Sequence, residues 1–453
     1  MIKDMTEGTP SKVLLGFAVP MMLSGMFQQF YNIADSVIAG QFAGSNAVAA
    51  VGASYPITML FIAIATGSGV GCSVIVSNFF GAKDYAKLKT TITTSIITII
   101  LLSLWLTLLG TIICNPLMHL MNTPSDIFGD SALYLRIYIW GLIFLFVYNI
   151  TTSIFNGLGD SKTPLYFLIF SSLFNVVLDY VFVAHFGLGV AGVAWATFIA
   201  QGISSILSIS CLIGRIKKLK TTKHYEYFSW SILGHISHIA IPSILQQSIV
   251  SIGQLLVQAL VNSYGTTVLY GYSAAIKIDS FFKIVIISMG NAVSNFTAQN
   301  LGGQKPERVK KGYTSSLLVM LTYCIVAFII CLVFSPTLIG IFLDSKTDPT
   351  LIKDVISIGT SYMIIVSAGY FACAVLLVNN GILRGSAYML GFTTATLTDL
   401  FVRVGAAYIL AHWFGYSAIW YSIPLGWTIG TLVSFVFCFK NTRKLSLQSS
   451  LKH

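Results

Sequence analysis

Residues 90–114 read TTITTSIITIILLSLWLTLLGTIIC, a run of 25 residues without a charged side chain. A helix needs about 20 predominantly apolar residues to cross the hydrocarbon core of a bilayer. Similar runs fill the rest of the chain, and only 9% of its 453 residues are charged. Because a soluble domain has about 25% charged residues, this composition excludes a soluble enzyme, a nucleic-acid-binding domain and a disulfide-linked secreted module.

About twelve apolar runs are long enough to cross a membrane, which predicts an all-α polytopic membrane protein. The runs are too long and too uniformly apolar for the alternating pattern of an outer-membrane β-barrel. Their approximate cores are 13–38, 47–79, 90–114, 131–156, 163–186, 189–214, 237–262, 267–301, 312–334, 354–383, 388–411 and 415–438.

The positive charges predict the orientation of the chain. Lys and Arg gather in alternate connecting segments, chiefly 83–89, 215–223, 305–311 and 440–452, whereas the other connecting segments hold only Lys346 and Lys353. Cytoplasmic loops carry the excess of positive charge in helical membrane proteins. We therefore expect a multi-pass protein of the plasma (inner) membrane with both termini in the cytoplasm. The net charge of +11 then reflects topology and not a nucleic-acid partner.

The sequence contains one internal repeat. Each half has six predicted spans, an even number, so both halves enter the membrane in the same direction and form a parallel repeat. We expect an N-lobe over 1–220, a cytoplasmic linker over 221–236 and a C-lobe over 237–453. The matches are Pro20 with Pro242 (offset 222), Asn78-x-x-Gly81-x-Lys83 with Asn300-x-x-Gly303-x-Lys305 (offset 222), Tyr134 with Tyr362 (offset 228) and Asn156-Gly157 with Asn380-Gly381 (offset 224).

Ionisable groups inside spans are the first functional candidates, because a charge at the bilayer centre costs at least a few kcal/mol. In the second half, Asp399 and Arg403 have i, i+4 spacing. Asp279 and Lys283 have the same spacing. Each pair can therefore form on one helix. Lys277 is left without a partner in sequence.

The first half carries two aspartates, Asp35 and Asp179, with no Lys or Arg near them in sequence. They can hold Na⁺ among oxygen ligands, with Asn175 and Thr197 completing the shell. Alternatively, one of them can hold a proton near neutral pH, because burial and mutual repulsion disfavour two charges. In a purely structural reading, they cap backbone groups or pair with a distant cation.

The two halves differ in their charges although they share a scaffold. At an offset of 224, Asn175 and Asp179 fall opposite Asp399 and Arg403. Pro20 lies inside the first span, where it removes a backbone hydrogen bond and favours a kink. We therefore expect Pro20 to act as a hinge.

On these residues the chain resembles the multidrug and toxic compound extrusion (MATE) family of cation-coupled exporters. The resemblance covers nearly the whole chain. It implies V-shaped lobes around a central cavity, and exchange of inward H⁺ or Na⁺ for outward organic cations, without enzymatic activity and without a cofactor other than the coupling ion. The residues that carry it are Pro20…Gln28-x-x-Tyr31-x-x-x-Asp35-x-x-x-x-Gly40, Gly157-Leu158-Gly159-Asp160-Ser161-Lys162-Thr163-Pro164, Asn175-x-x-x-Asp179, Thr197 and the loops at Gly81 and Gly303.

The resemblance also implies where the ligands bind. A further branch of the family has a glutamate on the seventh helix, where Ile239–Asn262 offers only glutamines, so we expect the coupling site in the N-lobe. The implied cation site is Asp35, Asn175, Asp179 and Thr197; the candidate substrate-binding residues are Gln28, Tyr31, Asn32 and Asn149.

The alternative function is a flippase for lipid-linked or polysaccharide substrates, because Lys277 and Arg403 could bind phosphates. A major-facilitator carrier is disfavoured, since the loop at 81–85 is not rich in Gly, Asp and Arg. A channel or a membrane enzyme is disfavoured as well, because the sequence shows no intramembrane His-Glu cluster, Ser/Lys dyad or phosphate loop. We expect a monomer in contact with membrane lipid that binds lipophilic organic cations by stacking and cation–π contacts.

Overall fold

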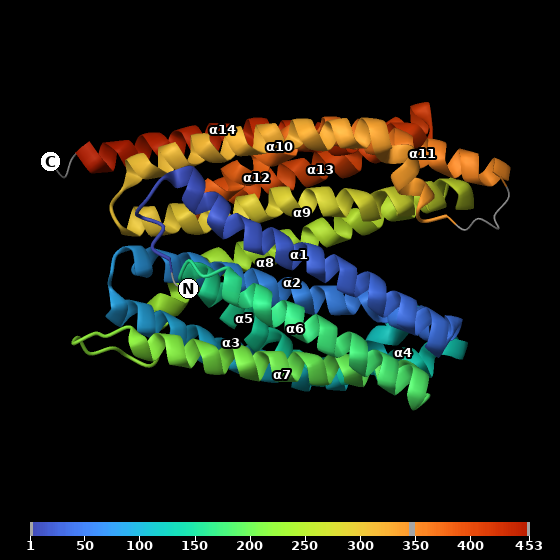
Figure 1. Ribbon diagram of the computed structural model, residues 1–453, viewed down its shortest axis with the longest axis horizontal. Helices are drawn as coiled ribbons and strands as arrows, with labels where there is room; N and C mark the ends of the chain where they lie inside the picture. The colour runs from blue at the N-terminus through green and yellow to red at the C-terminus, as the bar shows by residue number, and fades with distance from the viewer. Residues whose placement is uncertain (1–2, 344–348, 451–453) are drawn as a thin grey trace. The chain divides into compact units, whose positions relative to one another are not determined.

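The computed structural model of the protein describes residues 3–343 and 349–450. Lys346 and Lys452, two of the cations used to predict orientation, lie outside the described residues. The described chain is almost entirely helical, which confirms the all-α prediction (Figure 1). The elements are α1 (Pro10–Ile38), η1 (Ala39–Ala43), α2 (Ser45–Gly81), α3 (Tyr85–Leu120), α4 (Ser125–Trp140), α5 (Leu142–Gly157), α6 (Lys162–Asp179), η2 (Tyr180–His185), α7 (Gly189–Lys218), α8 (Trp230–Asn262), α9 (Thr266–Gly302), α10 (Pro306–Gly340), α11 (Pro349–Ala368), α12 (Tyr370–Gly385), α13 (Met389–Phe414), η3 (Tyr416–Ala418) and α14 (Ile419–Ser450).

Two of the twelve predicted spans are broken at a glycine. α4 and α5 meet at Gly141 with a bend of 48°, and α11 and α12 meet at Gly369. A Cβ atom on Gly369 would lie 2.8 Å from Pro424 Cβ, so a larger residue does not fit at this break.

By length and composition, ten of the described helices could cross a membrane, or eleven if the bent α4–α5 pair is one span. The twelfth predicted span is α9, which carries Lys277, Asp279 and Lys283. α9 is the predicted span that is not among these candidates.

The helices form two compact units, each described here by itself. One holds residues Val19–Ser248 with the start of the chain before Met5, and the other holds Met5–Ala18 and the chain from Ile249 onward. In the first unit, apolar side chains of α2, α3, α4 and α5 form one buried cluster. In the second, α12 lies so close to α9 that a Cβ on Gly381 would be 2.5 Å from Gly290 O. The ranges 1–220, 221–236 and 237–453 stay a prediction.

Helix ends correct the predicted register of the repeat. α5 ends at Gly157 and α12 at Gly385, which is an offset of 228. The following turns place Gly159 and Ala387 at positive φ, again at an offset of 228. The predicted match of Asn156-Gly157 with Asn380-Gly381, at an offset of 224, is therefore wrong by one helical turn. That match relied only on the dipeptide Asn-Gly, which ends α5 but lies one turn before the end of α12.

This register also changes which intramembrane residues correspond. At an offset of 228, Asn175 falls opposite Arg403 and Asp179 opposite Ala407. Asp179 therefore has no charged counterpart in the second half. The predicted pairing of Asn175 and Asp179 with Asp399 and Arg403 is replaced by this one.

The residues before α1 are fixed to the loop between α9 and α10. Met5 is fully buried, and its N–H donates to Gln299 Oε1 at 2.9 Å. Lys305 Nζ donates to the Thr6 carbonyl at 3.0 Å. Arg308 donates to the carbonyls of Met5, Glu7 and Gly8 at 2.7–3.2 Å. The side chains of this repeated loop thus bind the chain's own backbone.

We expect Arg308→Ala to release this segment, because charge-assisted hydrogen bonds contribute about 1.5–3 kcal/mol each. Amide hydrogen exchange of the peptide that includes Met5 should become at least tenfold faster. Lys311→Ala is the matched control, since Lys311 is exposed on the same helix. Equal exchange in the two variants would show that Arg308 does not hold the segment.

Candidate functional site

A polar pocket of about 430 Å³ lies within the first unit, between α1, α2, α4, α5, α6 and α7. No charged residue is among the described residues that line it. All four candidate substrate-binding residues and two of the four candidate cation ligands line this one pocket: Gln28, Tyr31, Asn32, Asn149, Asn175 and Thr197.

Several lining residues were not predicted. Gln201 and Ser204 follow Thr197 at i+4 and i+7 on α7, and Ser171 precedes Asn175 by one turn on α6. These spacings place the polar groups of each helix on one face, which lines the pocket. That spacing could have indicated these three pocket-lining residues from the sequence. The aromatic lining residues Tyr138 and Tyr148 had no such signal, since aromatics are frequent throughout the chain.

The two predicted carboxyls meet next to this pocket. Asp179 is fully buried at the end of α6, and Asp35 on α1 lies close enough to interact with it electrostatically. Two ionised carboxylates cannot donate to each other, so a hydrogen bond between the two groups requires that one of them holds a proton. Neither forms an ion pair with any residue of the described chain. Because the two charges repel, the pair favours uptake of one cation or proton.

Oxygen atoms without hydrogen-bond partners collect at this pair. They are Asp35 Oδ1, both carboxyl oxygens of Asp179, and Asn175 Oδ1. Buried polar atoms are normally hydrogen-bonded, and leaving several unpaired is costly. Oxygen atoms are the preferred ligands of hard cations. The arrangement therefore fits either a small cation or a shared proton.

Both aspartates lie beside π-helical turns. Asp179 is directly followed by η2, and α1 continues into η1 four residues after Asp35. Phe42 of η1 contacts Tyr180 of η2 edge-on, with ring centroids 5.7 Å apart. π-helical turns in α-helices occur frequently at functional sites, because they disturb the regular backbone hydrogen bonding.

Tyrosines connect the carboxyls to the pocket. Tyr31 and Thr197 both line the pocket, and Tyr31 interacts electrostatically with both aspartates. Tyr134 on α4 interacts electrostatically with both as well. Tyr31 therefore interacts with the carboxyl pair and also lines the pocket.

Pro20 lies inside α1, which runs continuously from Pro10 to Ile38. The hydroxyl of Ser24 donates to Pro20 O at 2.9 Å. The division between the two compact units crosses α1 between Ala18 and Val19, one residue before Pro20. A hinge role for Pro20 stays a prediction.

In the second unit, Asp279 is fully compensated. Lys283 Nζ lies 2.6 Å from its carboxylate, which confirms the predicted i, i+4 pair. Tyr362 and Tyr370 also donate to it, at 3.1 and 2.7 Å. These tyrosines come from α11 and α12, so no spacing within α9 could reveal them. Lys277 Nζ lies 5.6 Å from the ring centroid of Phe342.

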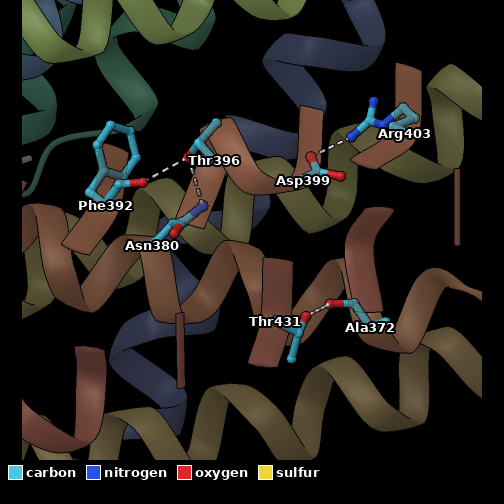
Figure 2. A network of polar contacts seen from close by, with 7 residues as sticks. All are labelled: Ala372, Asn380, Phe392, Thr396, Asp399, Arg403 and Thr431. Atoms are coloured by element: carbon cyan, nitrogen blue, oxygen red, sulfur yellow. Dashed lines mark hydrogen bonds and ion pairs between the residues drawn. The ribbon is translucent and has the colours of Figure 1, made fainter. Parts of the chain in front are cut away.

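The second predicted pair, Asp399 with Arg403, also forms. Figure 2 shows the two side chains turned toward each other along α13. The guanidinium additionally lies over the Trp427 ring, 5.8 Å from its centroid. Nearby, Asn380 Nδ2 donates to Thr396 Oγ1 at 3.4 Å and ties α12 to α13. The four second-half charges of these two pairs are therefore neutralised locally, unlike Asp35 and Asp179.

The fold and this site define a class: a multi-pass helical membrane protein built from a repeat, with a carboxyl pair beside a polar pocket in its first half. The chain belongs to the MatE family, whose model matches residues 20–181 and again residues 242–409. The second match starts at an offset of 222 from the first and ends at an offset of 228. These are the offsets of the proline match and of the helix-end match of the repeat.

Individual proteins that are similar to this chain differ from it at most positions. The chain is 28% identical to the probable multidrug resistance protein YoeA of Bacillus subtilis, over 92% of this chain and 91% of that one. It is 25% identical to an FAD transporter of Shewanella oneidensis, over 76% of each. A crystal structure of a MATE protein in complex with MaL6 superposes with a TM-score of 0.90 at 23% identity, covering 98% of both chains. This likeness shows a common fold.

Proposed function

We infer that the protein exports lipophilic organic cations in exchange for H⁺ or Na⁺. The observation that carries this proposal is the uncompensated pair Asp35 and Asp179 beside the polar pocket. A relative in Bacillus subtilis is named a probable multidrug resistance protein, which supports the same class of substrate. The proposed orientation places both termini in the cytoplasm of a cell with the protein in its plasma (inner) membrane.

The polar pocket, whose described lining carries no charge, suits a planar organic cation. Tyr31, Tyr138 and Tyr148 supply aromatic faces, and Asn149 and Gln201 supply amide dipoles. Aromatic faces attract organic cations by about 0.5–2 kcal/mol per contact. The carboxyl pair next to the pocket adds negative potential that a bound cation or proton would reduce. The drug and the coupling ion would therefore oppose each other, which is the energetic requirement for exchange.

Coupling in this proposal proceeds by alternating access. With the site open to the outside, H⁺ or Na⁺ loads at Asp35 and Asp179 and weakens binding of the organic cation. After the cation leaves, α1 bends near Pro20 and the protein reorients to release the coupling ion inside. The ion at the carboxyl pair and the cargo in the neighbouring pocket thus bind in turn, and the inward gradient drives export.

An anionic cargo is the second candidate, because one relative is named an FAD transporter and the sequence left a lipid flippase open. Flavin nucleotides and lipid-linked phosphates need positive charge at their phosphates. The described lining of the pocket has no Lys or Arg. The electrostatics of this pocket therefore favour the cationic cargo.

Purified protein in liposomes tests the proposal directly. We expect ethidium to accumulate against its gradient when an inward H⁺ or Na⁺ gradient is imposed, and not when both are absent. Running the two ion gradients separately identifies the coupling ion. Transport of FAD with no ethidium transport under either gradient would replace the proposal with the anionic cargo.

A further inference from the structure

A basic pocket of about 590 Å³ lies in the first unit, away from the polar pocket, between the α2–α3 turn and the end of α7. It is lined by five lysines: Lys83, Lys89, Lys217, Lys220 and Lys223. The hydroxyl-bearing Thr221 and Thr222 also line it. Ammonium and hydroxyl groups in this number can donate several hydrogen bonds to one anionic group.

The positive charge of this basic pocket is not neutralised within the described chain. Its one carboxylate, Asp84, accepts the N–H of Lys87 at the start of α3 and lies 3.9 Å from Lys87 Nζ. None of the five lysines forms an ion pair with a described residue. Lys89 instead lies 5.3 Å from the ring centroid of Tyr225. Five like charges therefore face one space and repel one another unless an anion binds.

In the corresponding loop of the second half, the cationic side chains bind backbone carbonyl groups. There the side chains of Lys305 and Arg308 are occupied by the carbonyls of Met5–Gly8. Within the described residues, the side chains of Lys83 and Lys89 donate no hydrogen bond to a backbone carbonyl. The asymmetry leaves the basic pocket available to a ligand that supplies anionic oxygens.

The position of the basic pocket indicates which kind of anionic ligand binds there. Three candidate spans have an end here: Ala49–Gly81, Tyr85–Leu120 and Gly189–Lys218. Span ends lie at the level of the lipid headgroups, and basic pockets between span ends bind phosphate-bearing headgroups. We propose that Lys89, Lys217 and Lys220, with their neighbours in the basic pocket, bind the phosphate of an anionic phospholipid.

Lipid binding by the full-length protein in neutral detergent tests this proposal. Native mass spectrometry would compare phosphatidylglycerol with phosphatidylcholine, and inorganic phosphate would be added as a competitor. We expect the wild type to prefer phosphatidylglycerol, and Lys89→Gln/Lys217→Gln/Lys220→Gln to bind it at least tenfold more weakly. The triple Lys→Arg variant at these positions should keep the preference, because charge is retained.

The matched control is Lys162→Gln/Lys311→Gln/Lys440→Gln, which removes the same charge from exposed positions elsewhere and should bind phosphatidylglycerol as the wild type does. Equal loss in the control, or no loss in the Lys89, Lys217 and Lys220 variant, would overturn the proposal. Full competition by millimolar inorganic phosphate would assign the basic pocket to a soluble phosphate compound and overturn the lipid assignment. None of these outcomes depends on dye transport, so the proposed function is judged separately.

Discussion

Asp35→Asn and Asp179→Asn are each expected to reduce ion-driven ethidium efflux at least tenfold, to the level of liposomes without protein. Asparagine keeps the size of the side chain and removes its charge, so each variant mimics a permanently protonated site. With one carboxyl group permanently neutral, the pair loses the repulsion between two charges that favours uptake of the coupling ion. Efflux from proteoliposomes under an imposed H⁺ or Na⁺ gradient is the measurement.

A binding measurement separates loss of coupling from loss of structure. Ethidium affinity of the wild type should fall when H⁺ or Na⁺ is raised, whereas the affinity of both variants should not respond. Asp126→Asn provides the control, because Asp126 is exposed in the first turn of α4 and loses the same charge. Wild-type efflux by both the Asp35 and the Asp179 variant would remove the carboxyl pair from the mechanism.

Asp279→Ala is expected to destabilise the protein by about 3–5 kcal/mol. The carboxylate is fully buried and accepts from Lys283, Tyr362 and Tyr370. Removing it leaves a poorly exposed ammonium group and two buried hydroxyls without their acceptor, and breaking one side of a buried ion pair costs about this much. The melting temperature in detergent should fall by roughly 5 °C or more.

Two further variants assign that loss to its cause. Asp279→Leu combined with Lys283→Met removes both charges and should recover much of the melting temperature, since a buried pair is often replaceable by apolar residues. Asp354→Ala on α11 removes an exposed carboxylate and should leave the melting temperature unchanged. A double variant as unstable as Asp279→Ala would place the cost in the tyrosine contacts and not in the unpaired ammonium.

The two halves use one repeated tyrosine in different electrostatic settings. Tyr134 and Tyr362 match in the repeat, and each interacts with a buried carboxyl group of its own half. In the second half that carboxyl group also has Lys283. In the first half Tyr134 faces Asp35 and Asp179, which have no described cation. The same scaffold position therefore supports a neutralised cluster in one half and an uncompensated one in the other.

Local patterns predicted much of this protein correctly. The i, i+4 pairs Asp279–Lys283 and Asp399–Arg403 form because both partners lie on one helix, whose geometry places them together. The breaks at Gly141 and Gly369 were not predicted, because an apolar run does not reveal where its helix bends. The register of the repeat was misplaced near Asn380, where only the helix end shows the correspondence.

The helical class, the spans and the candidate residues could all be derived from the amino-acid sequence, since apolar length, helical spacing and a repeated motif are properties of neighbouring residues. Which of the candidates meet depends on the packing of the helices. Asp35 and Asp179 are far apart in the chain, and their contact depends on how α1, α4, α6 and α7 pack. The tyrosines on Asp279 and the backbone held by Arg308 are likewise long-range contacts. Charge compensation is a property of three-dimensional neighbours, which a pattern along one helix does not contain.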